Sequence, residues 1–127
     1  MSLLLDTQAL LWFATDAQRF RPETLATIYA ADRIWVSAVS AYEVTLKHEL
    51  GKLPVAARLL ADLSGYLRSQ RFDSLPISLT HAEAAGRLPM AHRDPFDRLL
   101  AAQALVENLM IVSTDEAFDQ FGVRRLW

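Results

Sequence analysis

The chain alternates short apolar runs with longer segments in which apolar residues recur at helical spacing. Runs of four or five mostly apolar residues are typical of strands that are buried on both faces of a parallel sheet. Such strands are predicted at Ser2–Leu5, Arg33–Ser37 and 109–113. Shorter strands are predicted at 75–78, where Pro76 favours an edge position, and at 123–127.

The segments between these runs have the spacing and the end signals of helices. Gly51 is well placed to close one helix, and Pro54 and Pro95 stand where two others begin. Helices are predicted at 7–14, 38–50, 55–71, 80–87, 95–107 and 115–121. Strands that alternate with helices imply right-handed crossovers and a mainly parallel sheet covered on both faces. The 127 residues contain no repeat and no linker-like stretch, so we expect a single α/β domain over 1–127 with four to five strands.

Composition narrows the class of protein. The formal net charge is −2 and the isoelectric point is near 5.9, which argues against a passive nucleic-acid binder but not against an enzyme that holds cations. The absence of cysteine excludes disulfides and thiolate chemistry. The start of the chain makes a poor signal peptide and no apolar run is long enough for a membrane span, so we expect a cytoplasmic protein without membrane contact.

Four acidic residues from distant parts of the chain are predicted to meet at one edge of the sheet. Asp6 follows the first strand, and Asp115 lies two residues beyond the strand at 109–113. Asp97 lies in the first turn of the helix at 95–107, and Glu43 lies early in a helix that follows a strand. Because ligands of parallel sheets bind at the carboxyl ends of the strands, this edge is the expected site.

Helical phase gives a sharper prediction for two of these acids. Val39, Tyr42, Leu46 and Leu50 fall on one stripe, which we expect to face the core with Glu43 at its border and Lys47 beside it. The helix at 95–107 is apolar nearly all round, so it should be buried. We expect Asp97 to be the polar exception on its inner side.

Each acid also has a plain structural explanation as a helix cap or a dipole partner. Asp94 before Pro95 has the pattern of an N-cap, and Asp6 could cap the helix that follows it. Ser40 with Glu43, and Ser113 with Glu116, fit the capping-box spacing S-x-x-E. Capping does not require that four chain segments bring their acids to one edge, which favours a further role.

Clustered carboxylates raise one another's pKa and therefore need cations to stay ionised together. Their hard oxygen atoms suit Mg²⁺ or Mn²⁺, and such ions support the hydrolysis of phosphodiesters. We therefore interpret Asp97 as a metal residue and Asp94 as a helix cap.

Four stretches resemble PIN-domain ribonucleases of the VapC toxin type: LLLDTQALLW, SAVSAYEVTLKHELGKL, HRDPFDRLLAAQA and IVSTDEAF. The resemblance implies a three-layer α/β/α fold and a Mg²⁺- or Mn²⁺-dependent endoribonuclease that acts on RNA as the toxin of a toxin–antitoxin pair. It also implies a small VapB-like antitoxin partner and a homodimer or larger assembly.

The resemblance assigns roles residue by residue. The catalytic acids of the family fall on Asp6, Glu43, Asp97 and Asp115, with Asp6 and Asp97 holding the first ion. Ser113 falls on an auxiliary hydroxyl of the family, and Asp94 fits the DPFDR pattern of one subgroup. Position 8 is Gln, where many relatives carry Ser, Thr or His.

The remaining polar and aromatic residues have simpler interpretations. Without another histidine or cysteine at ligand spacing, the three histidines are interpreted as surface or capping residues: His48, His81 and His92. Four aromatic residues are expected in the core: Trp12, Phe13, Tyr29 and Trp35. Four basic residues either guide an RNA backbone or are solvated surface charges or partners of nearby acids: Lys47, Lys52, Arg93 and Arg98.

Two other functions are weighed against the nuclease. Phosphoryl transfer through an aspartyl-phosphate is one of them. Phosphatases of this class require a second acid at position 8, which is Gln here. Phosphate-accepting receiver domains require an acid near the end of a central strand, whereas Asp73 precedes its strand. A non-catalytic PIN-like module that docks a basic partner peptide through its acidic rim is the second alternative. Metal binding together with RNA cleavage would separate it from the nuclease.

Overall fold

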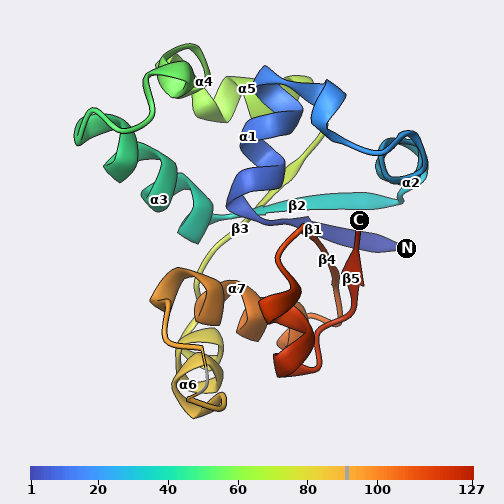
Figure 1. The fold of residues 1–127 in the computed structure, drawn as a ribbon, viewed down its shortest axis with the longest axis vertical. Coiled ribbons are helices and arrows are strands. Elements are labelled where there is room, and N and C mark those ends of the chain that lie inside the picture. The colour runs from blue at the N-terminus through green and yellow to red at the C-terminus, as the bar shows by residue number, and fades with distance from the viewer. Residues whose placement is uncertain (91) are drawn as a thin grey trace.

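The computed structural model describes residues 1–90 and 92–127, and its centre is a five-stranded sheet in which every pair of neighbours is parallel. The strands lie in the order β3-β2-β1-β4-β5 (Figure 1). Their bounds are Ser2–Leu5 (β1), Arg33–Ser37 (β2), Asp73–Leu75 (β3), Met110–Val112 (β4) and Arg125–Leu126 (β5).

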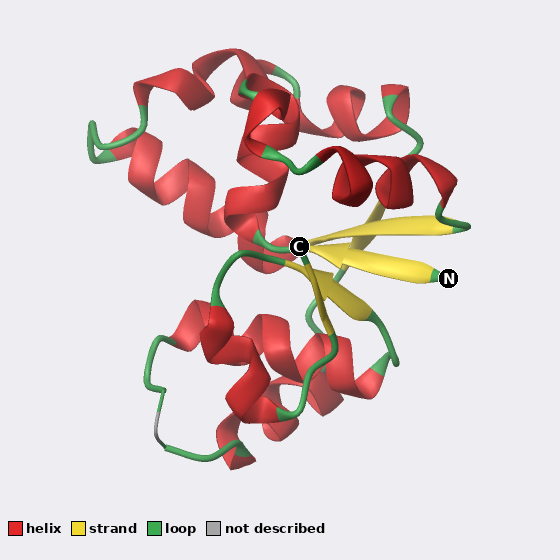
Figure 2. Ribbon diagram, turned by 45° about the vertical axis from the view of Figure 1, so that its right-hand side comes forward, coloured by secondary structure: helices red, strands yellow, loops and turns green. Residues whose placement is uncertain are grey.

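Helices cover both faces of this sheet and make three layers, as Figures 1 and 2 show together. One layer contains α1 to α5, and the opposite layer contains α6, α7 and the 3₁₀ helix η3. The α-helices are α1 (Thr7–Thr15), α2 (Pro22–Ala30), α3 (Ala38–Glu49), α4 (Ala57–Ala61), α5 (Leu63–Ser69), α6 (Leu79–Arg87) and α7 (Pro95–Val106). The 3₁₀ helices are η1 (Ala17–Arg19), η2 (Pro54–Ala56) and η3 (Glu116–Phe121). The predicted α/β/α fold with a parallel sheet is confirmed.

The apolar runs form strands because their side chains reach two cores. Leu3 and Leu5 point into the core under α1, whereas Leu4 packs with Ile111 and Leu100 under α7. The three leucines of β1 have no exposed surface, and each buried leucine contributes roughly 2 kcal/mol to folding. This two-sided burial explains why the run carries no polar alternation.

Two of the predicted elements have different bounds in the structure. The strand predicted at 75–78 is instead Asp73–Leu75, because Pro76 has no N–H with which to continue the ladder. The helix predicted over 55–71 is divided at Asp62, whose side chain accepts a hydrogen bond from the N–H of Gly65. A side chain at Gly65 would collide with that carboxylate, since a Cβ there would lie 2.0 Å from its Oδ2.

Helix α2 is an element that the apolar pattern did not predict. It begins at Pro22, the favoured first position of a helix, and buries only Thr24 and Ile28. Two buried positions give too narrow a stripe to reveal a helix by periodicity.

The orientation of α3 also corrects the prediction. Its buried residues are Val39, Ser40, Glu43 and Val44, whereas Tyr42 and the two leucines of the predicted stripe, Leu46 and Leu50, are exposed. The hydroxyl of Ser40 lies 3.0 Å from that of Thr7 in α1, so a polar contact takes the place of the expected apolar one.

The aromatic prediction holds for three of its four residues. Trp12, Phe13 and Trp35 are partly buried and pack against the two cores, but Tyr29 is 71% exposed. Among the described residues, no helix combines the length and apolar character needed to cross a bilayer.

Candidate active site

The strand order brings the carboxyl ends of β1, β2 and β4 side by side. Leu5 is in register with Val36 of β2 and with Val112 of β4, so Asp6 lies level with Ser37, the last residue of β2, and with Ser113, the first residue after β4. The N–H of Asp6 donates a hydrogen bond of 3.1 Å to the carbonyl of Val112. The first turn of α3 and the loop before η3 therefore flank Asp6.

All four predicted acids line one cleft of about 420 Å³ at this edge. Its lining residues are Asp6, Thr7, Gln8, Glu43, Lys47, Asp94, Asp97, Thr114 and Asp115. A larger cavity of about 590 Å³ lies near the amino ends of the strands and contains none of the four.

Three aspartates at the cleft also cap helices, as their structural interpretation predicts for Asp6 and Asp94. Asp6 accepts a hydrogen bond of 2.7 Å from the N–H of Ala9 at the start of α1. Asp94 accepts one of 2.9 Å from Phe96. Asp115 caps η3 through Ala117, also at 2.9 Å. These caps hold each carboxylate at the mouth of the cleft with oxygen atoms to spare.

The two predicted capping boxes are wrong. Ser37, not Ser40, is the N-cap of α3 and accepts a hydrogen bond from Val39. Asp115 is the N-cap of η3, while the hydroxyl of Ser113 accepts a hydrogen bond of 2.9 Å from the N–H of Asp115. Ser113 is thus buried and contacts both Asp6 and the backbone of Asp115.

Burial and mutual repulsion make the carboxylates costly to ionise. The pKa of Asp6 is raised to about 6, chiefly by burial and to a smaller extent by the charges of Asp97 and Asp115, against opposing hydrogen bonds from Ser113 and Ala9. Burial is also the largest cause that raises the pKa of Asp97, and Asp94 and Asp115 add to it while the His92 hydrogen bond opposes it. A cation in the cleft would relieve this repulsion.

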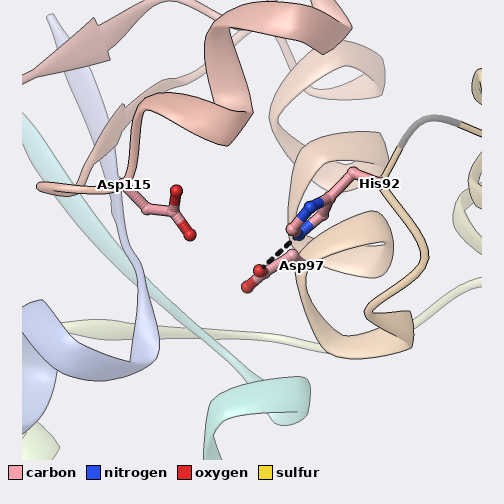
Figure 3. A group of neighbouring side chains, drawn as sticks. All are labelled: His92, Asp97 and Asp115. Carbon is pink, nitrogen blue, oxygen red and sulfur yellow. Dashed lines mark hydrogen bonds and ion pairs between the residues drawn. The ribbon is translucent and has the colours of Figure 1, made fainter.

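Sequence reasoning did not place His92 beside the cleft acids. Its Nε2 lies 2.8 Å from Oδ2 of Asp97. Figure 3 shows this ring and the carboxylates of Asp97 and Asp115 pointing into one space, with one ligand atom of each within 4.8 Å of the others. The only signal in the sequence is that His92 stands two residues before the N-cap of α7, because its partners are carboxylates rather than histidines or cysteines. By contrast, His81 is the predicted capping residue, at the start of α6.

The basic residues separate into different roles. Lys47 places its Nζ 2.7 Å from Oε2 of Glu43, so it is a partner of an acid at the cleft. Arg98 is buried and donates hydrogen bonds to backbone carbonyls, so it is neither a solvated surface charge nor the partner of an acid, and its guanidinium is not free to guide RNA. Arg93 and Lys52 are exposed.

The sequence pattern of one known family, the PIN domain, matches residues 3–123. The chain belongs to the PIN domain family. This PIN domain is 28% identical to Ribonuclease VapC22 of Mycobacterium tuberculosis (strain ATCC 25618 / H37Rv). The match extends over 115 residues, which are 90% of this chain and 87% of the relative.

Solved structures share the fold of this PIN domain along its whole length. VapBC2 from Rickettsia felis, bound to a DNA fragment from its promoter, matches with a TM-score of 0.74 and 18% identity over 100% of this chain and 99% of the other. DNA-bound VapBC from Salmonella typhimurium matches with a TM-score of 0.73 and 18% identity over 99% and 97%. FitAcB from Neisseria gonorrhoeae matches with a TM-score of 0.68 and 19% identity, over 98% of this chain and 96% of the other.

Proposed function

We propose that this PIN domain is a metal-dependent endoribonuclease of the VapC type, the toxin of a toxin–antitoxin pair. The observation that carries the proposal is the convergence of four carboxylates from separate chain segments on one cleft: Asp6, Glu43, Asp97 and Asp115. The family match over 3–123 supports one functional domain, and the relative named Ribonuclease VapC22 supports RNA as the substrate. The complexes of similar fold support a small antitoxin partner and an assembly of several chains.

The donor atoms of the cleft fit Mg²⁺ or Mn²⁺. Carboxylate oxygens are the ligands that both ions accept, and the repulsion among Asp6, Asp97 and Asp115 is relieved by a positive charge. We assign Asp6 and Asp97 to hold the ion, with Glu43 and Asp115 completing the pocket. A divalent ion bound there supplies an activated water and neutralises charge on the phosphate.

The other residues prepare the cleft for this chemistry. Asp94 caps α7 and so holds the first turn that carries Asp97. Ser113 supports Asp6 and the backbone of Asp115, and Lys47 holds the Glu43 carboxylate in the free protein. In the proposed hydrolysis, water oxygen bonds to phosphorus and the bond from phosphorus to O3′ breaks, which leaves a 5′-phosphate and a 3′-hydroxyl.

A non-catalytic module that binds a basic peptide through the same cleft is the second candidate. The observation in its favour is the charge of the lining, where five carboxylates, those of the four acids and of Asp94, accompany the single amine of Lys47. Such a module would bind its partner without cleaving RNA.

Cleavage of total RNA by the purified protein tests the proposal. We expect discrete fragments with Mn²⁺ or Mg²⁺, none in excess EDTA, and a loss of at least about 100-fold in Asp97→Asn, since one charged ligand is removed. Asp73→Asn is the matched control because Asp73 lies at the start of β3, away from the cleft. If wild type and Asp97→Asn cleave alike, the nuclease proposal is wrong and the binding module is favoured.

A further inference from the structure

His92 is held in place from two sides besides its contact with Asp97. Its backbone carbonyl accepts a hydrogen bond of 3.0 Å from the Arg98 guanidinium. Its ring meets the ring of Phe121 in η3 edge-on, with centroids 5.8 Å apart and an interplanar angle of 67°. The imidazole therefore has a defined position between α7 and η3, the element that Asp115 caps.

The contact with Arg98 belongs to a larger anchor. The Arg98 side chain is buried, and its two terminal nitrogens donate hydrogen bonds of 2.7 to 3.0 Å to four backbone carbonyls, one in the last turn of α6 and three between α6 and α7. These carbonyls belong to Ala85, Leu88, Pro89 and His92. Because Arg98 directly follows Asp97 in α7, the same helix turn that carries the acid also holds the segment that carries the histidine.

The Nε2 end of the ring faces the cleft acids. Nε2 is the ring atom that contacts Asp97. The His92 side chain is 26% exposed, so the imidazole is partly desolvated but still accessible to a ligand. Figure 3 shows Asp115 on the far side of the same space. One donor atom from each of His92, Asp97 and Asp115 lies within 4.8 Å of the others, which is close enough for all three to share one cation.

We propose that His92 is a nitrogen ligand of the metal site and makes that site favour Mn²⁺ over Mg²⁺. Mg²⁺ holds to oxygen ligands and retains its waters, whereas imidazole nitrogen is a good ligand for transition metals. Binding through Nε2 uses the neutral ring with its proton on Nδ1, and replaces the hydrogen bond from His92 to Asp97. This inference rests on the proposed metal site and adds a donor to its oxygen ligands.

Pulsed electron paramagnetic resonance of bound Mn²⁺ tests the assignment without any measurement of activity. We expect ¹⁴N coupling from a coordinated imidazole in the wild type, and its loss in His92→Gln. Glutamine can still donate an amide hydrogen bond to Asp97, so this variant separates loss of the ligand from loss of the support. His48→Gln is the matched control, since His48 lies at the end of α3 and does not line the cleft.

Binding titrations supply the second measurement. We expect His92→Gln to lower the affinity for Mn²⁺ about tenfold and the affinity for Mg²⁺ by less than about threefold. If His92→Gln does not fold, ¹⁵N-histidine labelling of the wild type shows whether a histidine is a ligand, because the ¹⁴N signal then changes to a ¹⁵N signal. His92 is the histidine that contacts an acid of the cleft, whereas His48 and His81 pair with Glu49 and Glu107.

The outcomes distinguish this inference from the proposed function. Mn²⁺ that binds and supports RNA cleavage without histidine nitrogen coupling overturns the role of His92 alone. Wild-type protein that binds neither ion overturns the metal site and the inference together. Nitrogen coupling in the wild type that persists in His92→Gln also contradicts the assignment.

Discussion

Asp97 and Arg98 are consecutive in α7, but their side chains enter different environments. Asp97 reaches the acidic cleft, whereas the guanidinium of Arg98 is buried and hydrogen-bonded to the carbonyls of the preceding segment. One helix turn thus supplies a site acid and anchors the chain that approaches it. Four predictions concern the stability that the Arg98 hydrogen bonds provide, the charges at the cleft, and the buried contacts of Gln103.

Replacement of Arg98 by lysine should destabilise the protein. Lysine keeps the charge but cannot reproduce the planar fork of donors, so partly buried carbonyls between α6 and α7 lose their partners. We expect the free energy of unfolding to fall by about 2 to 4 kcal/mol, measured by urea denaturation. Arg93→Lys is the matched control, because Arg93 is exposed, and should change it by less than about 0.5 kcal/mol. Equal stability of the two variants would show that the anchor contributes nothing.

Asp6→Asn should stabilise the metal-free protein at neutral pH. The folded pKa of Asp6, about 6, lies above its ordinary value of 3.8, so the contribution of Asp6 to stability is present below pH 3.8 and lost as pH rises through 6. Asparagine keeps the N-cap without the charge. In excess EDTA we expect the free energy of unfolding of this variant to exceed that of the wild type by about 1 to 3 kcal/mol at pH 8, measured by thermal and urea unfolding. Near pH 4 this difference should disappear.

Asp119→Asn provides the control of opposite sign. A hydrogen bond from Arg125 lowers the pKa of Asp119, so its contribution is present above pH 3.8 and lost as pH falls. This variant should therefore be less stable than the wild type at neutral pH. A gain of Asp6→Asn that is equal at pH 4 and pH 8 would argue that the effect does not come from the buried charge.

Lys47→Gln should strengthen cation binding at the cleft. The amine of Lys47 lies beside Glu43 and repels a second positive charge. We expect Mn²⁺ affinity to rise about threefold to tenfold at low ionic strength, with a smaller effect in salt, measured by calorimetric titration. Lys52→Gln removes the same charge from the loop after α3 and should have little effect. Weaker Mn²⁺ binding in Lys47→Gln would mean that the lysine holds Glu43 in its binding orientation.

Gln103→Met should destabilise the junction between the layers. The Gln103 side chain is fully buried, bonds to the hydroxyl of Ser37 at the start of α3, and donates a hydrogen bond of 3.2 Å to the carbonyl of Pro76. Methionine has a similar volume but leaves these groups unpaired, so we expect a loss of about 2 to 3 kcal/mol in urea unfolding. Gln120→Met, on the exposed face of η3, should be nearly neutral. A small effect at both positions would contradict the role of Gln103.

Two of the four acids, Asp6 and Asp115, could be placed from the sequence because their positions depend on strand ends. Asp6 and Asp115 follow apolar runs, and parallel strands present their carboxyl ends at one edge, so the edge was predictable without any side-chain contact. The caps at Asp6 and Asp94 were predictable for a similar reason, since capping is decided within a few residues.

Contacts between elements could not be predicted in the same way. The apolar spacing of α3 indicates a stripe through Tyr42 and Leu46, yet the helix is turned so that Ser40 meets Thr7 and both apolar residues are exposed. A charged residue such as Arg98 is expected at the surface, but its guanidinium is buried and donates hydrogen bonds to the carbonyls of Ala85 and Leu88, which only the tertiary structure brings close to it.

The sequence by itself determined the strands, most of the helices and the edge where the acids gather, because these follow from local periodicity and from the direction of parallel strands. Only the tertiary structure decided which acids are costly to ionise, which face of α3 is buried, and that His92 joins Asp97. The physical reason is that burial and side-chain contact depend on the strand order and on the rotation of each helix against its neighbours.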